Sequence, residues 1–399
     1  MKNIKILIFK VIMFLAYPSI SVRLKSALKA FIMVFWRRTT FYPPEVFTLH
    51  KNFSDHTKKK YAVSFCNGTS ALEAIGFALD LSDKSKVAIP DFGFQSTFMP
   101  LLNNGVAFDF YGYSSGTLTP DREELESVLN NKVSAIVICS LFANNLDENA
   151  IVQQAQKSGA YVIHDCSHSH FSSYKNEWMG SKSDISFFSL QGGKAVPAGE
   201  GAIVATDNLR WYKKMVYFGH FNNAQMLSNE PQMGIDLTDK TFGLGRKLRM
   251  HPIGASIANT YFSFYKNLSI RNNVHRNITS FVKLTKNIDL IESVLECDEN
   301  SHIGNVAMGV PVILADSIDF ERFKVGFWGQ FLTDVRYINY LKSMRLEDTS
   351  DTPDAARIAK VDKMLKDYKI MDGRFFHLSP SLFNFLVKKM LVDVQRCNK

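Results

Sequence analysis

Short apolar runs alternate with longer amphipathic stretches through the first half of the chain. The runs have the length of β-strands and are rich in β-branched and aromatic residues. They are Tyr61–Phe65, Lys86–Pro90, Val106–Phe110, Val133–Cys139, Tyr161–Asp165, a run that opens at Ser186, and Ala202–Thr206. Because several runs are apolar on both faces, they are typical of parallel strands covered on both sides by helices. The pattern predicts an α/β fold with a mostly parallel sheet.

The pattern changes after Met250, where strand-length runs give way to helical periodicity. The helix-like stretches there are Ile257–Lys266, Val282–Leu295 and, near the end, Pro380–Val394. Upstream, Thr119 and Asp147 precede acidic or polar first turns and are expected to cap helices. We therefore expect three parts: an N-terminal arm of residues 1–40, a large domain of residues 41–250 and a smaller α/β domain of residues 251–399.

Charge is unevenly distributed along the 399 residues. Lys and Arg outnumber Asp and Glu by 47 to 38, yet residues 1–44 contain eight basic residues and no acid. The rest of the chain is almost neutral, which argues against nucleic acid as a partner. The five cysteines are scattered and odd in number, which favours free thiols in a reducing compartment, the cytoplasm.

The basic arm holds two apolar stretches, from Ile6 to Ile20 and from Ala27 to Trp36. Each falls short of the roughly 20 residues that span a bilayer. A signal peptide is one interpretation, but no small-x-small cleavage site follows Val11–Tyr17. Two interpretations stay open with equal weight. The arm is either an amphipathic segment on an anionic membrane face or a helix that packs on the body or a second subunit.

The strongest chemical signal is a lysine between two glycine turns. Gly192 and Gly193 precede Lys194, and Gly199 and Gly201 follow it before a strand-like run resumes. Glycines allow the backbone to approach a ligand closely, and a partly desolvated lysine loses its proton more easily. Such an amine is a nucleophile towards aldehydes, as a Schiff-base lysine must be. The alternative is a loop lysine in a surface ion pair.

Two further segments favour the first interpretation. Asp165 ends a strand-like run, and an acid there faces the ligand crevice of an α/β sheet. It could pair with the pyridinium nitrogen of pyridoxal 5'-phosphate (PLP). Gly68, Thr69 and Ser70 lie between a strand and a helix, where backbone N–H groups and hydroxyls can seat a phosphate.

Histidines and a cysteine alternate beside this acid: His164, Cys166, His168 and His170. Such residues are zinc ligands, and in a continuing strand they would share one face. The strand is expected to end at Asp165, however, and the acid is better explained as a cofactor partner. We therefore expect no metal.

At this point the sequence resembles the DegT/StrS-type sugar aminotransferases, PLP enzymes of fold type I. The resemblance runs from about Phe41 to Gly254 and more weakly beyond. Its motifs, in order, are Asn67–Leu72, Ile89–Phe94, His164–His170, Gly180 with Asp184, Phe188–Lys194 followed by Gly199–Gly201, and Gly245–Met250. The lysine motif is specific, whereas the phosphate loop alone would not be.

The resemblance implies roles for individual residues. Lys194 would hold PLP and move protons, and Asp165 would grip the ring nitrogen. The expected cofactor contacts are Gly68, Thr69 and Ser70 at the phosphate, Phe94 stacked on the ring, His168 at the ring hydroxyl, Ser189 at the phosphate, and Lys247 at the phosphate of a neighbouring subunit. Arg249 and His170 are expected to contact substrate.

The expected function is amino transfer from glutamate or glutamine to a keto-sugar, either nucleotide-linked or an inosose-like cyclitol, in sugar biosynthesis. A homodimer is implied by the resemblance. Two alternatives remain: a PLP-dependent sugar dehydratase of the same fold, or a non-catalytic membrane-associated protein. Known dehydratase relatives tend to carry histidine where this chain has Lys194, which disfavours the first.

Overall fold

The structure is a computed structural model that describes residues 11, 20–36, 44–114, 116–220, 244–285, 291–293, 295, 297–315, 332–334, 338–339 and 355–397. Its centre is a seven-stranded sheet with the strand order β1-β10-β9-β6-β5-β2-β4. The strands are β1 (Tyr61–Phe65), β2 (Lys86–Pro90), β4 (Ala107–Tyr111), β5 (Ala135–Cys139), β6 (Tyr161–Asp165), β9 (Ile185–Ser189) and β10 (Ala202–Thr206). Strand β10 runs opposite to the other six strands, which share one direction. The predicted α/β fold with a mostly parallel sheet is confirmed.

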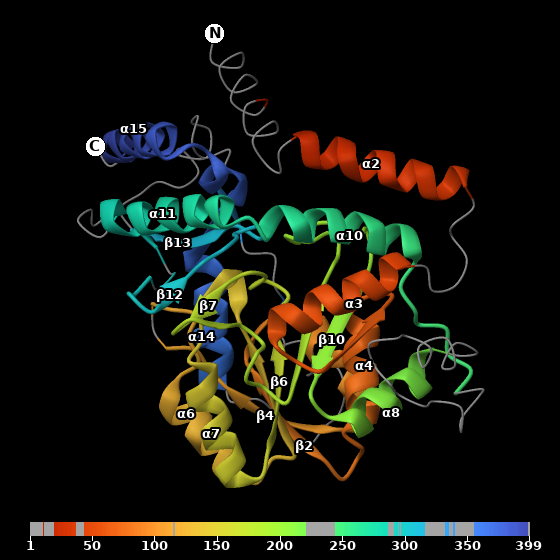
Figure 1. The fold of residues 1–399 in the computed structure, drawn as a ribbon. Coiled ribbons are helices and arrows are strands. Elements are labelled where there is room, and N and C mark those ends of the chain that lie inside the picture. Colours follow the sequence, from red (N-terminus) through yellow and green to blue (C-terminus); the bar gives the residue numbers. More distant parts are fainter. Residues whose placement is uncertain are drawn as a thin grey trace.

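Helices cover both faces of this sheet (Figure 1). One face packs against α4 (Gly68–Ala78) and α8 (Leu209–Gly219). The other packs against α3 (Pro44–Thr57), α6 (Arg122–Asn130), α7 (Glu148–Ser158) and α10 (Pro252–Tyr265). Strand β1 shows why: Val63 and Phe65 join the first core, whereas Ala62, just before Val63, joins the second. Alternate side chains therefore supply two buried layers.

A second sheet lies beyond α11 (Leu268–Thr285). It has the order β11-β13-β16-β14 and is antiparallel. Its strands are β11 (Ile291–Ser293), β13 (Val310–Leu314), β14 (Leu332–Asp334) and β16 (Tyr368–Met371), with α14 (Ala355–Asp367) and α15 (Pro380–Cys397) alongside. The shorter elements are α5 (Met99–Leu102), β3 (Phe92–Gly93), β7 (Ser173–Tyr174), β8 (Glu177–Trp178), β12 (Ser301–His302) and β15 (Ile338–Asn339). The division at residue 250 stays a prediction.

Two local predictions were wrong. The stretch Val282–Leu295 is not one helix, because α11 ends at Thr285 and β11 pairs with β13. The helical stripe of α11 lies earlier, with Val274, Ile278 and Phe281 buried. Asp121, not Thr119, caps α6: its carboxylate accepts hydrogen bonds from the backbone N–H groups of the first turn. Asp147 caps α7 as predicted.

The arm is described from Ile20 to Trp36, and most of the apolar stretch from Ile6 lies outside the described residues. Within the described part, α2 (Ile20–Phe35) lies along the outer side of α10 (Figure 1). Val22, Ser26 and Met33 are its buried residues. Among the helices that the structure describes, none has both the length and the apolar character to cross a bilayer.

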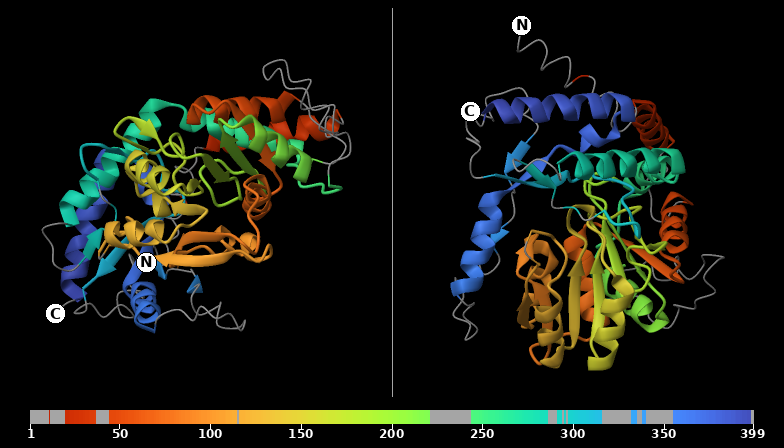
Figure 2. Two further views of the ribbon diagram at one scale, coloured as in Figure 1. Left: turned by 90° about the horizontal axis from the view of Figure 1, so that it is seen from below. Right: turned by 90° about the vertical axis from the view of Figure 1, so that its left-hand side faces the viewer.

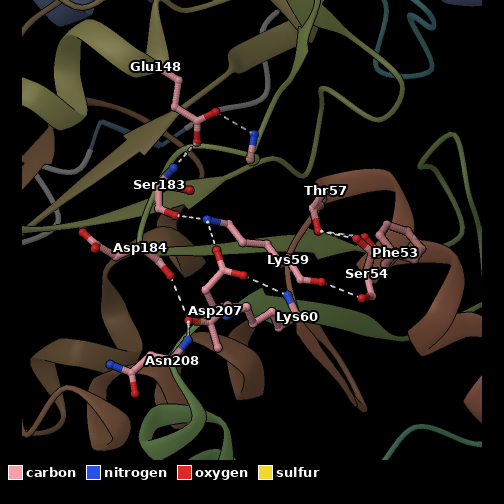
Figure 3. Close-up of polar contacts among 12 residues, drawn as sticks. Phe53, Ser54, Thr57, Lys59, Lys60, Glu148, Ser183, Asp184, Asp207 and Asn208 are labelled. Carbon is pink, nitrogen blue, oxygen red and sulfur yellow. Dashed lines mark hydrogen bonds and ion pairs between the residues drawn. The ribbon is translucent and has the colours of Figure 1, made fainter. Parts of the chain in front are cut away.

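The amino edge of the sheet is held together by a buried lysine, Lys59, just before β1. Its ammonium donates to the carbonyl oxygen of Ser183 at 2.5 Å and lies 3.4 Å from the carboxylate of Asp207, which follows β10 (Figure 3). Asp207 in turn accepts from the backbone N–H of Lys60. The network therefore ties β1, β9 and β10 together at the edge opposite the strand ends that carry Asp165.

Replacing this lysine should weaken the fold. We expect Lys59→Met to lower the free energy of unfolding by about 2 kcal/mol, because a buried carbonyl loses its donor while the half-exposed Asp207 keeps solvent contact. The matched control is Lys58→Met, where the ion pair with Glu177 is exposed and the loss should be about 0.5 kcal/mol or less. Urea denaturation measures both. Equal losses would contradict this account of the network.

Candidate active site

The carboxyl ends of neighbouring strands bring three predicted site segments to one edge of the large sheet. Asp165 ends β6 and Ser189 ends β9, next to it in the sheet. The Lys194 loop leaves from β9, and the turn into α4 follows β1. The sheet topology thus brings together segments that are up to about 125 residues apart in the sequence. This is expected at the edge of an α/β sheet where ligands bind.

The turn into α4 forms a narrow seat. Asn67 caps the helix, and its side-chain oxygen accepts from the backbone N–H of Ser70 at 2.8 Å. Gly68 lies against Ser189: a Cβ added to this glycine would stand 3.6 Å from the Ser189 Cβ. Thr69 is exposed and Ser70 is buried. Because the first N–H groups of a helix attract anions, this end of α4 suits a phosphate.

The loop after β9 folds back on itself and presents Lys194. Gly192 donates its N–H to the carbonyl of Gly199 at 2.9 Å, and Lys194 donates its N–H to Gln191 at 2.8 Å. Gly199 has a φ of +81°, a conformation that glycine adopts without strain. Burial lowers the pKa of Lys194 to about 8, although the Asp165 carboxylate acts in the opposite direction. The Asp165 carboxylate therefore lies within electrostatic reach of the Lys194 amine.

Asp165 is fixed by one hydrogen bond to each carboxylate oxygen. Oδ1 accepts from the backbone N–H of Ser167 at 2.9 Å, and Oδ2 accepts from the hydroxyl of Thr97 at 3.0 Å. Thr97 was not among the predicted site residues. It lies three residues after Phe94, and nothing in that local sequence reveals that its hydroxyl reaches β6.

His168 is held as a neutral ring with a defined tautomer. The backbone N–H of Phe142 donates to its Nδ1 at 3.1 Å, so the ring proton belongs on Nε2. Burial, together with the charge of Lys194, lowers the pKa of His168 well below its usual value. Phe142 itself has a φ of +52°, and this unusual conformation aims its N–H at the ring. Nε2 can therefore act as a donor at neutral pH.

Behind Asp165, its neighbour His164 points into the opposite core layer. Its Nε2 is 2.8 Å from the Ser140 hydroxyl and its Nδ1 is 2.9 Å from Glu148. Burial by itself would raise the pKa of Glu148, but His164 and hydrogen bonds from Ser183 bring it to about 2. Figure 3 shows Glu148 over Ser183, whose N–H it accepts at 2.9 Å. The serine, histidine and glutamate are all buried, so this chain of hydrogen bonds supports the strand ends.

His170 and Phe94, two other predicted site residues, have contrasting surroundings. His170 is buried against the rings of Phe53 and Phe188, and burial beside Lys194 lowers its pKa to about 3. Phe94 is 52% exposed at the turn between β3 and α5. No contact of either with a substrate or a cofactor is given by this geometry, and both roles stay predictions.

Residues 247–249 form a strip beside the phosphate seat, with Lys247 and Arg249 at its two ends. The carbonyl of Leu248 between them accepts from the N–H of Cys66, one residue before Asn67, at 2.6 Å. Lys247 is exposed and forms a backbone bridge with His220. Arg249 is half-buried; burial lowers the pKa of His220, and the charge of Arg249 adds to this effect. The strip is adjacent to the seat through its backbone. Reach of either side chain to a cofactor or substrate stays a prediction.

Comparison with solved structures agrees with this architecture. The aminotransferase from Psychrobacter cryohalolentis superposes with a TM-score of 0.77 at 19% identity, covering 93% of this chain and 97% of that one. An E. coli GDP-4-keto-6-deoxy-D-mannose-3-dehydratase with bound hydrated PLP gives a TM-score of 0.75 at 15% identity, covering 93% and 96%. At such identities the likeness establishes the fold.

Curated relatives are similar over a shorter span. GDP-perosamine synthase from Escherichia coli O157:H7 is 29% identical over 166 residues, 42% of this chain and 46% of the relative. L-glutamine:2-deoxy-scyllo-inosose aminotransferase from Streptomyces fradiae is 24% identical over 154 residues, 39% and 36%. The chain thus aligns with less than half the length of either relative.

A family model covers much more of the chain. It matches residues 32–317, a range that includes the seat at Gly68, the acid Asp165, the lysine loop and the strip at Lys247. Since this match spans well over half of the sequence, the chain belongs to the DegT/DnrJ/EryC1/StrS aminotransferase family.

Proposed function

We propose that the protein is a PLP-dependent aminotransferase that moves an amino group from glutamate or glutamine to a keto-sugar. One observation carries the proposal: an amine with its pKa lowered to about 8 lies within electrostatic reach of a strand-end carboxylate. A helix N-terminus and Ser189 lie at the same sheet edge. The amine suits the aldehyde of PLP, the carboxylate suits its ring nitrogen, and the helix N-terminus with Ser189 suits its phosphate.

The residues present fit PLP in three respects. Gly68 leaves the space that a side chain would fill beside Ser189, so an anion can approach the N–H groups of α4. The Asp165 carboxylate is held in position by two donors and can face a protonated ring nitrogen. His168 offers Nε2–H, which suits the ring hydroxyl. Lys194 would hold the cofactor through its amine.

When bound, PLP supplies an electron sink for the carbon that loses or gains a proton. The chain supplies the proton transfers and the fixed charges. With a pKa of about 8, the Lys194 amine can both accept and donate a proton near neutral pH, as a general acid and base must. Asp165 holds positive charge at the far end of the ring, and Thr97 keeps that carboxylate from rotating.

The acceptor is proposed at the level of a keto-sugar or keto-cyclitol. The relatives named above include a GDP-perosamine synthase and an inosose aminotransferase, at 29% and 24% identity. They support a keto-sugar and a keto-cyclitol as acceptor equally. We also propose a homodimer in which Lys247 faces the neighbouring site, as the family resemblance implies. A sugar dehydratase is the second candidate, because a dehydratase shares the fold. The retained Lys194 favours amino transfer.

The lysine is the first test. With PLP, the wild-type protein should show the yellow absorption of a lysine-bound cofactor, and glutamate should bleach it with release of 2-oxoglutarate. Lys194→Ala should lose the band and reduce amino transfer by about a thousandfold or more. Lys182→Ala, on the surface beside Glu177, is the control and should keep both properties. An unchanged spectrum in Lys194→Ala would show that Lys194 does not bind the cofactor.

The rate at which the apoprotein takes up PLP should depend on pH. Only the neutral amine attacks an aldehyde, so the rate should rise with pH and level off above about 8, rather than near 10.5 as for an exposed lysine. Because the Asp165 charge raises this pKa, Asp165→Asn should move the midpoint to lower pH. Stopped-flow absorbance measures it, with Glu177→Gln as the control. If the midpoint stays fixed in Asp165→Asn, the charge of Asp165 does not influence the pKa of Lys194.

Thr97 should act through Asp165. We expect Thr97→Val, which keeps the shape and removes the hydroxyl, to weaken PLP affinity about tenfold, as the loss of a hydrogen bond to a charged group predicts. Thr97→Ser should restore most of the affinity because it retains the donor. Fluorescence titration of the apoprotein with PLP distinguishes them. Equal weakening by valine and serine would point to packing instead.

A further inference from the structure

Helix α2 buries one face and exposes the other, and both faces are apolar. The buried side chains, Val22, Ser26 and Met33, lie against α10. The exposed apolar side chains are Ile20, Leu24, Leu28, Phe31, Ile32, Val34 and Phe35, followed by Trp36. At about 100° per residue, the stripe through Leu24, Phe31 and Phe35 lies about 180° from the buried face. A stripe of this kind is unusual in water.

Basic residues border this exposed stripe. On the same helical projection, Arg23 and Lys25 lie about 100° from the centre of the stripe on opposite sides, and Lys29 lies beyond Lys25 towards the buried face. Phe31 is 64% exposed and Phe35 is 67% exposed, so their rings contribute little to the packing on α10. An outward apolar stripe with cations along both margins is the pattern of a helix that lies in a membrane interface.

Helix α15 repeats the pattern on the same side of the molecule. It packs on α11 through a face that includes Phe383, Val387 and Met390. Its outward face carries Leu382, Phe385, Lys388, Lys389 and Val392. Both views from the side place α2 over α10 and α15 over α11, at the upper end of the molecule (Figures 1 and 2). Two helices from opposite ends of the chain therefore present similar side chains to one side.

The charged residues of the layer formed by α2, α10, α11 and α15 are almost all basic. Helices α2, α11 and α15 each contain three Lys or Arg, α10 contains none, and Asp393 is the only Asp or Glu in the four helices. A two-fold dimer through this layer would set the patch against itself and bring like charges together. An anionic lipid surface instead complements the cations and accepts the aromatic side chains.

We propose that the outward faces of α2 and α15 form a docking surface for an anionic lipid bilayer. The protein would lie on the bilayer with Phe31, Phe35 and Phe385 at the headgroup boundary and the lysines among the phosphates. The active-site residues at the edge of the large sheet belong to other elements, so catalysis and docking can be tested separately.

Co-sedimentation of the full-length protein with vesicles tests the surface. The protein should bind vesicles of equal parts phosphatidylcholine and phosphatidylglycerol and show little binding to phosphatidylcholine alone. Phe31→Glu combined with Phe35→Glu should reduce binding by about tenfold or more, since it puts charge into the apolar stripe. Lys25→Glu combined with Lys29→Glu should also reduce it by about tenfold or more, and salt should weaken wild-type binding.

A matched charge change provides the control. Lys84→Glu combined with Lys157→Glu alters net charge equally near the amino end of β2 and the end of α7, away from α2, and should leave binding unchanged. The PLP absorption band should be the same in every variant, which shows that the fold is intact. Absent binding to anionic vesicles overturns the proposal, as does equal loss in the control. Light scattering that shows an oligomer dissolved by the Phe31 and Phe35 changes would assign the surface to a second copy instead.

Discussion

The attraction between a half-buried amine and a carboxylate at the end of a neighbouring strand is the interaction on which the site depends. Burial makes Lys194 easier to deprotonate, and the negative charge of Asp165 limits that effect. The balance leaves a pKa of about 8, near enough to neutrality for a proton to move in either direction. More complete burial without the carboxylate would leave a neutral amine that could not serve as an acid.

The residues around the edge of the large sheet hold these two groups in place. The glycine turns bring the lysine loop back to the sheet edge, and Asn67 caps the helix whose first turn lies against Ser189. Behind the site, Ser140, His164 and Glu148 join β5, β6 and α7 through buried hydrogen bonds. Buried polar groups of this kind are costly unless every partner is satisfied, and here they are matched donor to acceptor. The strand ends are therefore rigid where the chemistry requires precision.

Two residues with unusual backbone conformations also lie beside the site. Phe142 and Ala143 both adopt a positive φ directly after β5, although neither is glycine. Such conformations cost about 1–3 kcal/mol each and persist where the surroundings enforce them. One consequence is visible: the N–H of Phe142 is aimed at His168 and fixes its tautomer. The proposed lipid surface, on the outward faces of α2 and α15, lies at the other end of the molecule from α7 and β2.

The sequence alone determined the strands of the large sheet, the lysine loop, Asp165 and the seat at Gly68, because each depends on a short run of residues whose local pattern is distinctive. It did not find Thr97 or the tautomer of His168, since both depend on contacts between segments far apart in the chain. It misplaced the cap of α6 and the end of α11, where the partner strand β13 decides the structure of residues 291–293. The outward direction of the apolar stripe on α2 was also decided by tertiary structure. Helical periodicity defines a stripe, but only packing on α10 determines which face remains exposed.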